Sequence, residues 1–312
     1  YPTRKESNAM MDDLNTAMDN ANASIAEYNT IAAYIAKADG INESIASDYK
    51  TQHANGTISE SLETISQKLE VATYNYVTEN FTYAVALSDT WNSTGTNTSA
   101  ADVKGEHWSD NKEYTYKNQF DGWGDPKQGY PAGSWTIDFD QEVKLPAGEY
   151  VFKVAGRKSI DATLELVVTM GETELGTVND FPSSNEALGI NKAGATSFDA
   201  NDPAGFAKEG KGYGWQWRYV RFVLEEESTV KVAIHAETNM IYNWVSFGDY
   251  TLQMSEDTYL EANKDVINTA VTAAEALVNT LPMGDAENTA LQNALNMTYK
   301  TGDEMSEKTE AL

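Results

Sequence analysis

Apolar residues near the start of the chain recur every three or four positions, which is the spacing of one face of an α-helix. Between residues 5 and 38 this stripe consists of Met11, Leu14, Met18, Ala21, Ile25, Tyr28, Ala32 and Ile35. The opposite face carries Asp, Asn, Ser, Thr and Lys. Asp39-Gly40 then interrupts the pattern, as expected at a helix C-terminus. We therefore predict one long amphipathic helix over residues 5–38.

Two shorter helical patterns follow. Ile41, Ile45 and Tyr49 predict a second helix that ends at the turn 53–56, and Thr57 with Glu60 has the form of a capping box for a third helix. The apolar stripe of that third helix comprises Ile58, Leu62, Ile65, Leu69, Ala72 and Tyr76. Three stripes joined by short turns predict an antiparallel helical bundle over residues 1–80.

From about Phe81 the period changes from that of a helix to the two-residue alternation of a strand. The alternating segments are 135–139, 150–154, 164–168, 220–224, 230–234 and 244–252, with Gly and Pro turn signals between them. Repeated short strands of this kind predict an antiparallel β-sandwich of the jelly-roll type over residues 81–254. The Asn-, Gly-, Ser- and Asp-rich stretch 179–212 is interpreted as a long insertion that is either functional or disordered.

Helical spacing returns at Ser255. Its stripe is Leu260, Ile267, Ala270, Ala274 and Leu277, and Leu291 and Leu295 begin another helix after a turn at 281–284, with Asp285 as its expected N-cap. We interpret residues 255–312 as a helical hairpin, truncated from a second bundle, and the chain as a piece of a longer modular protein. The predicted fold class is α+β multidomain, with an antiparallel β-sandwich flanked by N- and C-terminal helical bundles.

Charge narrows the range of partners. The chain has 48 acidic and 22 basic residues and a formal net charge of −26. Such a surface repels phosphate backbones and anionic lipid headgroups, so we expect no nucleic-acid binding and no binding to anionic membrane surfaces. No run of 18 apolar residues occurs, and no transmembrane segment is expected.

Cysteine is absent, which excludes disulfides, thiolate metal sites and cysteine nucleophiles. The remaining composition is rich in Asn, Thr, Ser, Tyr and Gly and poor in Lys and Arg. That balance favours an extracellular or cell-surface location over a cytosolic one.

Catalytic motifs are not apparent. The three histidines are His53 in a turn, where exposure is expected, His107 in a loop, and His235 on the face of its strand opposite Val232 and Ile234. No nucleophile elbow, zinc-protease motif or phosphate-binding glycine loop occurs. Among 48 carboxylates a glycosidase pair cannot be singled out. We expect no enzyme; a jelly-roll lyase or hydrolase would need His107 or His235 to converge with a Tyr or carboxylate in one cleft.

Aromatic residues supply the candidate chemistry, with seven Trp and seventeen Tyr. A flat ring stacks on the C–H face of a sugar while neighbouring polar side chains bond its hydroxyls. The predicted ligand-binding residues are Trp123, Tyr130, Arg157, Trp215 and Trp217, with the rings stacking and the arginine bonding hydroxyls. In 215–224, alternation puts Arg218 and Val220 on one face and Trp217 and Tyr219 on the other. The alternative is that these rings simply pack beneath neighbouring helices or loops.

A metal site is a further hypothesis. Asp89 lies near the first predicted strand and Asp249 in the last, and such strands can lie close enough in a jelly roll to share a structural Ca²⁺. The alternative is that each is a solvated acidic residue at a strand edge. No other cofactor is expected.

Residues 135–252 resemble a galactose-binding-like jelly roll of the carbohydrate-binding-module type. The resemblance is carried by the segments LPAGEYVFKVAGR (145–157) and NWVSFGDYTL (243–252). The closing strand that leads directly into helices is similar to modules of large surface proteins of Gram-negative gut bacteria, in which helical bundles separate jelly rolls. The resemblance implies extracellular glycan binding or a spacer role beside other domains, although the insertion 179–212 departs from the usual pattern.

The function expected from the sequence is therefore a non-catalytic glycan-binding module of a secreted or cell-surface protein. Its expected partners are a polysaccharide or other glycan and other domains of a larger chain. The alternative is a structural spacer or adhesive element that presents other domains and has no ligand of its own.

Overall fold

A computed structural model of the 312-residue chain describes residues 2–88, 91–95, 120–123, 135–181, 183, 216–238, 243–280, 284 and 286–312. The chain divides into two compact units. The first comprises Tyr1–Tyr76 with Ser184–Trp217, and the second comprises Val77–Ser183 with Arg218–Leu312. The C-terminal helices thus belong to the same unit as most of the β-sandwich.

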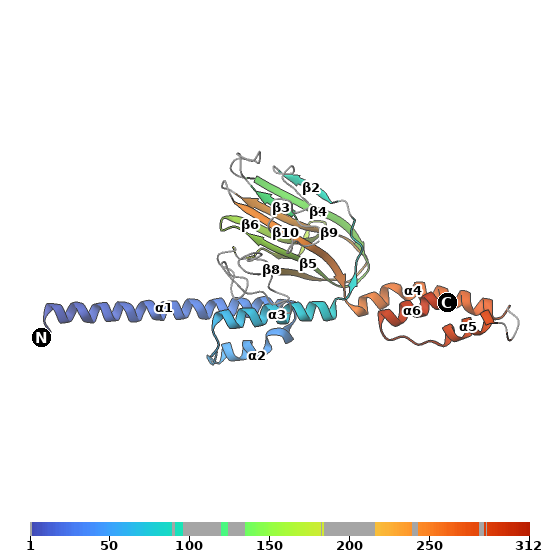
Figure 1. Ribbon diagram of the computed structural model, residues 1–312, viewed down its shortest axis with the longest axis horizontal. Coiled ribbons are helices and arrows are strands. Elements are labelled where there is room, and N and C mark those ends of the chain that lie inside the picture. The colour runs from blue at the N-terminus through green and yellow to red at the C-terminus, as the bar shows by residue number, and fades with distance from the viewer. Residues whose placement is uncertain are drawn as a thin grey trace. The chain divides into compact units, whose positions relative to one another are not determined.

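Helices α1 (Arg4–Ile41), α2 (Glu43–Ala54) and α3 (Leu62–Asn80) confirm the three predicted N-terminal helices (Figure 1). At the start of α1 the Thr3 hydroxyl accepts a hydrogen bond from the Glu6 amide at 3.3 Å, and the Glu6 carboxylate accepts one from the Thr3 amide at 2.7 Å. The buried core of this bundle consists of Ile31, Ile35, Ala38, Ala46, Ile65 and Leu69.

Only the C-terminal half of α1 packs into that core. Met11, Leu14, Met18 and Ile25 are 55–62% exposed, so the prediction that the whole stripe packs inside the bundle is wrong for its first half. The reason is length. At about 1.5 Å per residue, the 12 residues of α2 and the 19 of α3 span roughly 18 and 29 Å, whereas the 38 residues of α1 span about 57 Å.

Two helix boundaries also differ from prediction. α1 continues through residues 39–40 to Ile41, because Asn42 both closes α1 with its backbone and accepts a hydrogen bond from the Ser44 amide as N-cap of α2. The capping box expected at 57–60 is wrong, since α3 begins only at Leu62. The Thr57 hydroxyl instead donates to the Gln52 carbonyl, and Glu60 forms an ion pair with Lys68.

The β-sandwich is built from two antiparallel sheets (Figure 1). The first sheet has the order β1 (Tyr83–Ala84), β10 (Trp244–Met254), β5 (Gly148–Lys158), β8 (Gln216–Leu224), with β3 (Phe120–Trp123) also paired to β10. The second has the order β2 (Asn92–Gly95), β4 (Trp135–Leu145), β9 (Ser228–Thr238), β6 (Ala162–Met170), β7 (Thr173–Val178). Each alternating segment of the sequence lies in one of these strands, which confirms the predicted fold class.

The apolar side chains at alternate positions of each strand fill the space between the sheets. Phe152 and Val154 of β5 face Leu164 and Leu166 of β6 and Ile234 of β9 in one continuous core, all at 0% exposure. Trp91 joins its edge, stacked on Phe139 with ring centroids 4.5 Å apart. The side chains of Trp135 and Trp244 lie outside the described part of the structure.

The C-terminal segment contains three helices rather than a hairpin: α4 (Glu256–Val278), α5 (Ala286–Asn296) and α6 (Gly302–Ala311). The sequence did not predict α6 because this helix is short and its apolar stripe is weak. Met305 is its one buried large apolar side chain. A capping box marks its start, in which Thr301 accepts from the Glu304 amide at 3.3 Å.

The start of α4 is fixed directly to the sandwich. The Thr258 hydroxyl accepts a hydrogen bond from the Glu149 amide of β5 at 2.8 Å. Gly148 leaves the room for this approach, because a Cβ there would lie 2.2 Å from the Thr258 methyl carbon. The Tyr259 ring stacks on Tyr83 of β1 at 4.1 Å. The link between sandwich and C-terminal helices is therefore a packed joint rather than a bare linker.

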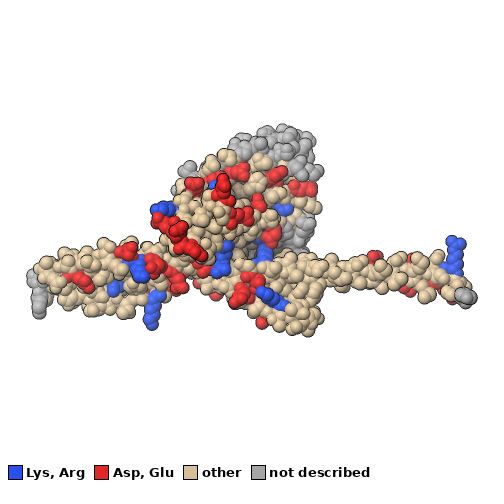
Figure 2. Space-filling view, turned by 180° about the vertical axis from the view of Figure 1, so that it is seen from behind, with Lys and Arg blue, Asp and Glu red and all other residues tan. Residues whose placement is uncertain are grey.

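The surface is acidic, as the composition predicts. On the face seen in Figure 2, Asp and Glu side chains gather over the sandwich, with fewer Lys and Arg among them. None of the helices in the described ranges combines the length and the apolar character needed to cross a membrane.

Candidate functional site

The candidate site lies on the side of the first sheet that faces away from the sandwich core. In β5 the core side is formed by Tyr150, Phe152 and Val154, so the intervening residues point to the opposite side. We call this opposite side the outer face. Its described side chains include Lys153 and Arg157 of β5, Trp217, Tyr219 and Arg221 of β8, and Thr251 and Gln253 of β10.

Backbone register brings two of the predicted site segments to one end of this sheet. Trp123 of β3 is directly opposite Trp244 of β10. Two residues further along β10, Ser246 pairs with Asp121 of β3 on one side and with Arg157 of β5 on the other. Residues 121–123 and Arg157 are therefore separated by a single strand. The side chains of Trp123 and Trp244 lie outside the described part.

Arg157 and Trp217 are buried. Arg157 is 4% exposed and Trp217 is 3% exposed, and the Trp217 ring lies 5.9 Å from the ring of Tyr74 in α3. The face predicted for Trp217 is correct, opposite Val220 and Phe222. Its ring is not an open stacking surface in this structure, which agrees with the packed alternative for this residue.

The other candidates fall where the structure gives no description. Tyr130, Trp215 and Asp89 lie outside the described residues, as does the side chain of Asp249. Within the described residues no group of three His, Asp or Glu side chains is arranged to hold a metal ion. The Ca²⁺ site at Asp89 and Asp249 stays a prediction.

Sequence reasoning missed several polar members of the outer face. Thr251 and Gln253 each have a buried side-chain oxygen without a hydrogen-bond partner in the described structure. Lys153 is 8% exposed and Tyr219 is 5% exposed. The alternating pattern within 150–154 and 244–252 could have identified them, because the residues between the core positions must lie together on the other side of the sheet.

The histidines do not form a catalytic cluster in the described structure. His235 contacts Asp138 with its Nδ1 2.7 Å from a carboxylate oxygen, on the solvent-facing side of the second sheet. His53 is half-buried rather than exposed as expected, because its ring stacks on Tyr28 at 3.9 Å. His107 lies outside the described residues.

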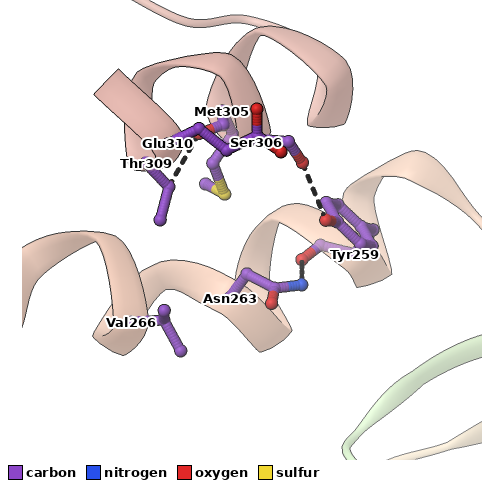
Figure 3. Close-up of a pocket in the computed structure, with 7 residues that line it drawn as sticks. All are labelled: Tyr259, Asn263, Val266, Met305, Ser306, Thr309 and Glu310. Atoms are coloured by element: carbon purple, nitrogen blue, oxygen red, sulfur yellow. Dashed lines mark hydrogen bonds between the residues drawn. The ribbon is translucent and has the colours of Figure 1, made fainter. Parts of the chain in front are cut away.

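A groove of about 220 Å³ lies between α4 and α6 (Figure 3). Its lining residues are Tyr259, Asn263, Val266, Met305, Ser306, Thr309 and Glu310. The polar groups of its walls bond to each other: the Tyr259 and Ser306 hydroxyls are 2.9 Å apart, and Asn263 donates to the Tyr259 carbonyl at 2.8 Å. The bond between the Tyr259 and Ser306 hydroxyls holds α6 against α4.

No family model matches the chain, and no curated protein matches it. Solved structures do. The chain is similar to the carbohydrate-binding module TmCBM61, determined in complex with β-1,4-galactotriose, at 19% identity over 54% of this chain and 90% of that one, with a TM-score of 0.36. It is similar to the xylan-binding module CBM15 at 12% identity, over 56% of this chain and 97% of that one, with a TM-score of 0.27.

A third similar structure is the adhesin domain of Epf from Streptococcus pyogenes, at 9% identity over 45% of each chain, with a TM-score of 0.25. Identities and TM-scores this low do not transfer a ligand or an activity.

Proposed function

We propose that this chain is a non-catalytic glycan-binding module, with its ligand at the β3 end of the outer face. The observation that carries the proposal is the register of β3, β10 and β5. It brings Trp123 and Asp121 within one strand of Arg157, and these are the residue types that a sugar site combines. Tyr130 and Trp215 are proposed as further stacking residues.

The mode of binding follows from that chemistry. The Trp123 ring would stack on the C–H face of a sugar unit, and the Asp121 carboxylate would bond its hydroxyls. A shallow site of this kind buries few atoms, so we expect dissociation constants in roughly the millimolar to micromolar range. Such a module would act outside the cell or at its surface, where antibodies should label it on intact cells.

The test is a panel of soluble polysaccharides and oligosaccharides, titrated into the full chain and followed by calorimetry. Trp123→Ala should weaken binding about tenfold, because a stacked ring is worth about 1.5 kcal/mol. Trp123→Phe is the matched control, since it keeps an aromatic face and should retain most of the affinity. Equal affinity in all three chains would refute the site, and failure of every glycan to bind would refute the function.

The second candidate function is a spacer that presents other domains. It is favoured by the burial of Trp217 and Arg157, which are 3% and 4% exposed. A spacer needs a rigid joint, and the contacts of Thr258 and Tyr259 with the sandwich supply one. The glycan panel separates the two candidates, because a spacer binds none of its members.

A further inference from the structure

The N-terminal half of α1 carries an apolar stripe that no described part of the chain covers. We call Met11, Leu14, Met18, Ala21 and Ile25 the α1 stripe; its four large members are 55–62% exposed. Further along the same helix, Ile31, Ile35 and Ala38 are 2–5% exposed because α2 and α3 cover them. The alternating spacing of three and four residues is that of a seam between two helices.

Comparison with α4 shows that α1 lacks the aromatic residue by which α4 is joined to the β-sandwich. Shifted by 236 positions, the buried Ile31 and Ala38 of α1 correspond to the buried Ile267 and Ala274 of α4, so the two helices have a common packing pattern in this part. α4 contacts the sandwich through Thr258 and Tyr259. The corresponding residues of α1 are Asn22 and Ala23, and Ala23 has no ring with which to make the stacking contact of Tyr259.

The charges beside the stripe indicate which helix can cover it. With Met11 at heptad position a, the carboxylates Asp12, Asp13, Asp19 and Glu27 all occupy positions b and c, which lie away from the seam. The flanking positions e and g hold Asn15, Ala17, Asn22 and Ser24. A basic partner helix would be matched by acidic residues at e and g. Uncharged flanks instead permit a second chain that itself carries a net charge of −26.

We propose that the α1 stripe is a self-association surface, covered by the α1 stripe of a second copy running antiparallel. In this direction, with the overlap ending before the part of α1 that α2 and α3 cover, Met18 faces Leu14 of the second copy, and Met11 faces Ala21. In both pairs a small or branched side chain thus meets a long one and the seam is filled. A parallel pair would set Ala21 against Ala21 and leave a void.

Electrostatics favours the same direction. An antiparallel pair places the two α2–α3 ends at opposite ends of the shared seam, residues 4–28, which at about 1.5 Å per residue is roughly 36 Å long. This length exceeds the Debye length of about 8 Å at physiological ionic strength, so repulsion between the two acidic chains is screened.

Sedimentation equilibrium of the full chain tests the association, at concentrations from roughly 1 to 200 μM. The unaltered chain should show a reversible monomer–dimer equilibrium. Met18→Glu should weaken it at least about tenfold, because the dimer would bury two unpaired carboxylates. Thr16→Glu is the control: it adds the same charge at position f, outside the seam, and should leave the equilibrium within about twofold. A monomer throughout this range, with circular dichroism showing intact helices, would overturn the proposal.

Direction can be tested by cross-linking because the chain contains no cysteine. Two single variants, Met11→Cys and Ala21→Cys, are oxidised separately and as an equimolar mixture. The antiparallel seam predicts disulfide-linked dimers mainly in the mixture, where the two cysteines face each other. Efficient linkage of each variant with itself would overturn the antiparallel arrangement.

Discussion

Tyr259 of α4 stacks on Tyr83 of β1, with ring centroids 4.1 Å apart and ring planes within 18° of parallel. The start of α6 packs against this pair. A Cβ at Gly302 would lie 2.4 Å from the ring of Tyr83 and 2.6 Å from that of Tyr259. The carboxylate of Glu256 accepts hydrogen bonds from the Gly302 amide and the Tyr83 hydroxyl at 3.2 and 3.3 Å. The β-sandwich, α4 and α6 therefore come into contact at Gly302.

Gly302→Ala should destabilise this joint. The added methyl overlaps two rings that are held by their own contacts, and overpacking of this kind costs about 1–3 kcal/mol. The free energy of unfolding, measured by denaturant titration, should fall by that amount. Gly40→Ala is the matched control, because no atom lies within 4 Å of a Cβ at that helical position and alanine favours the helix. An equal loss in both variants would contradict the close approach at Gly302.

Thr258→Val should weaken the connection between α4 and β5 without changing side-chain volume. Thr258 is 5% exposed, and its hydroxyl accepts from the Glu149 amide at 2.8 Å. Without that acceptor, the part-buried Glu149 amide loses its partner, at a cost of about 1 kcal/mol in unfolding free energy. Thr272→Val in the same helix should stay within about 0.5 kcal/mol, since its hydroxyl bonds the Asn268 carbonyl on an exposed face. Identical effects would refute a structural role for the Thr258 hydroxyl.

The sandwich could be predicted from the sequence because each strand has one face in the core. Phe152 and Val154 alternate with Val151 and Lys153, and this local pattern is sufficient to identify a strand. The short strand β3 carries too few residues to show a period. Its pairing with β10, which brings Trp123 to the same end of the sheet as Arg157, is a long-range property that only the register reveals.

The sequence does not predict which element packs against a given face of a helix or sheet. Met11 and Ile35 belong to one stripe and look alike in the sequence, yet one is exposed and the other buried, because helix length decides how far α2 and α3 reach. Trp217 was correctly assigned to the side opposite the core. The alternation of residues along the strand does not show which element packs against that side. Likewise Arg218 lies on the core side with an acidic partner, Asp180, that is distant in sequence.

Asp180→Asn should destabilise the sandwich through Arg218. Arg218 is 1% exposed, its Nε is 2.9 Å from the Asp180 carboxylate, and its guanidinium carbon lies 5.4 Å from the centre of the Phe181 ring. Neutralising the partner of a buried cation costs about 1–3 kcal/mol here, less than for a fully buried pair because the Asp180 side chain is 49% exposed.

The control for that variant is Glu227→Gln. Glu227 pairs with Lys144 on the surface, with side chains 62% and 67% exposed, and such pairs contribute little in water. Its unfolding free energy should change by less than about 0.5 kcal/mol. A loss as large as that of Asp180→Asn would mean that burial of Arg218 does not decide the effect.

Alkaline pH should unfold the sandwich partly through Tyr150. Burial raises the pKa of this phenol from 10.0 to about 12, and its hydroxyl donates to the Pro146 carbonyl at 2.8 Å. In the unfolded chain the phenol ionises near pH 10, whereas in the folded chain it stays neutral until about pH 12. The folded state therefore binds more protons between these values, and stability is lost as pH rises from 10 to 12.

Tyr150→Phe separates this titration from the others in the chain. The variant should be less stable than the unaltered protein near neutral pH, because the hydrogen bond to Pro146 is lost. Between pH 10 and 12 its melting temperature should fall less steeply, because it lacks the buried phenol. Melting curves recorded by circular dichroism across this range measure both slopes, and parallel slopes would show that the Tyr150 hydroxyl ionises alike in both states.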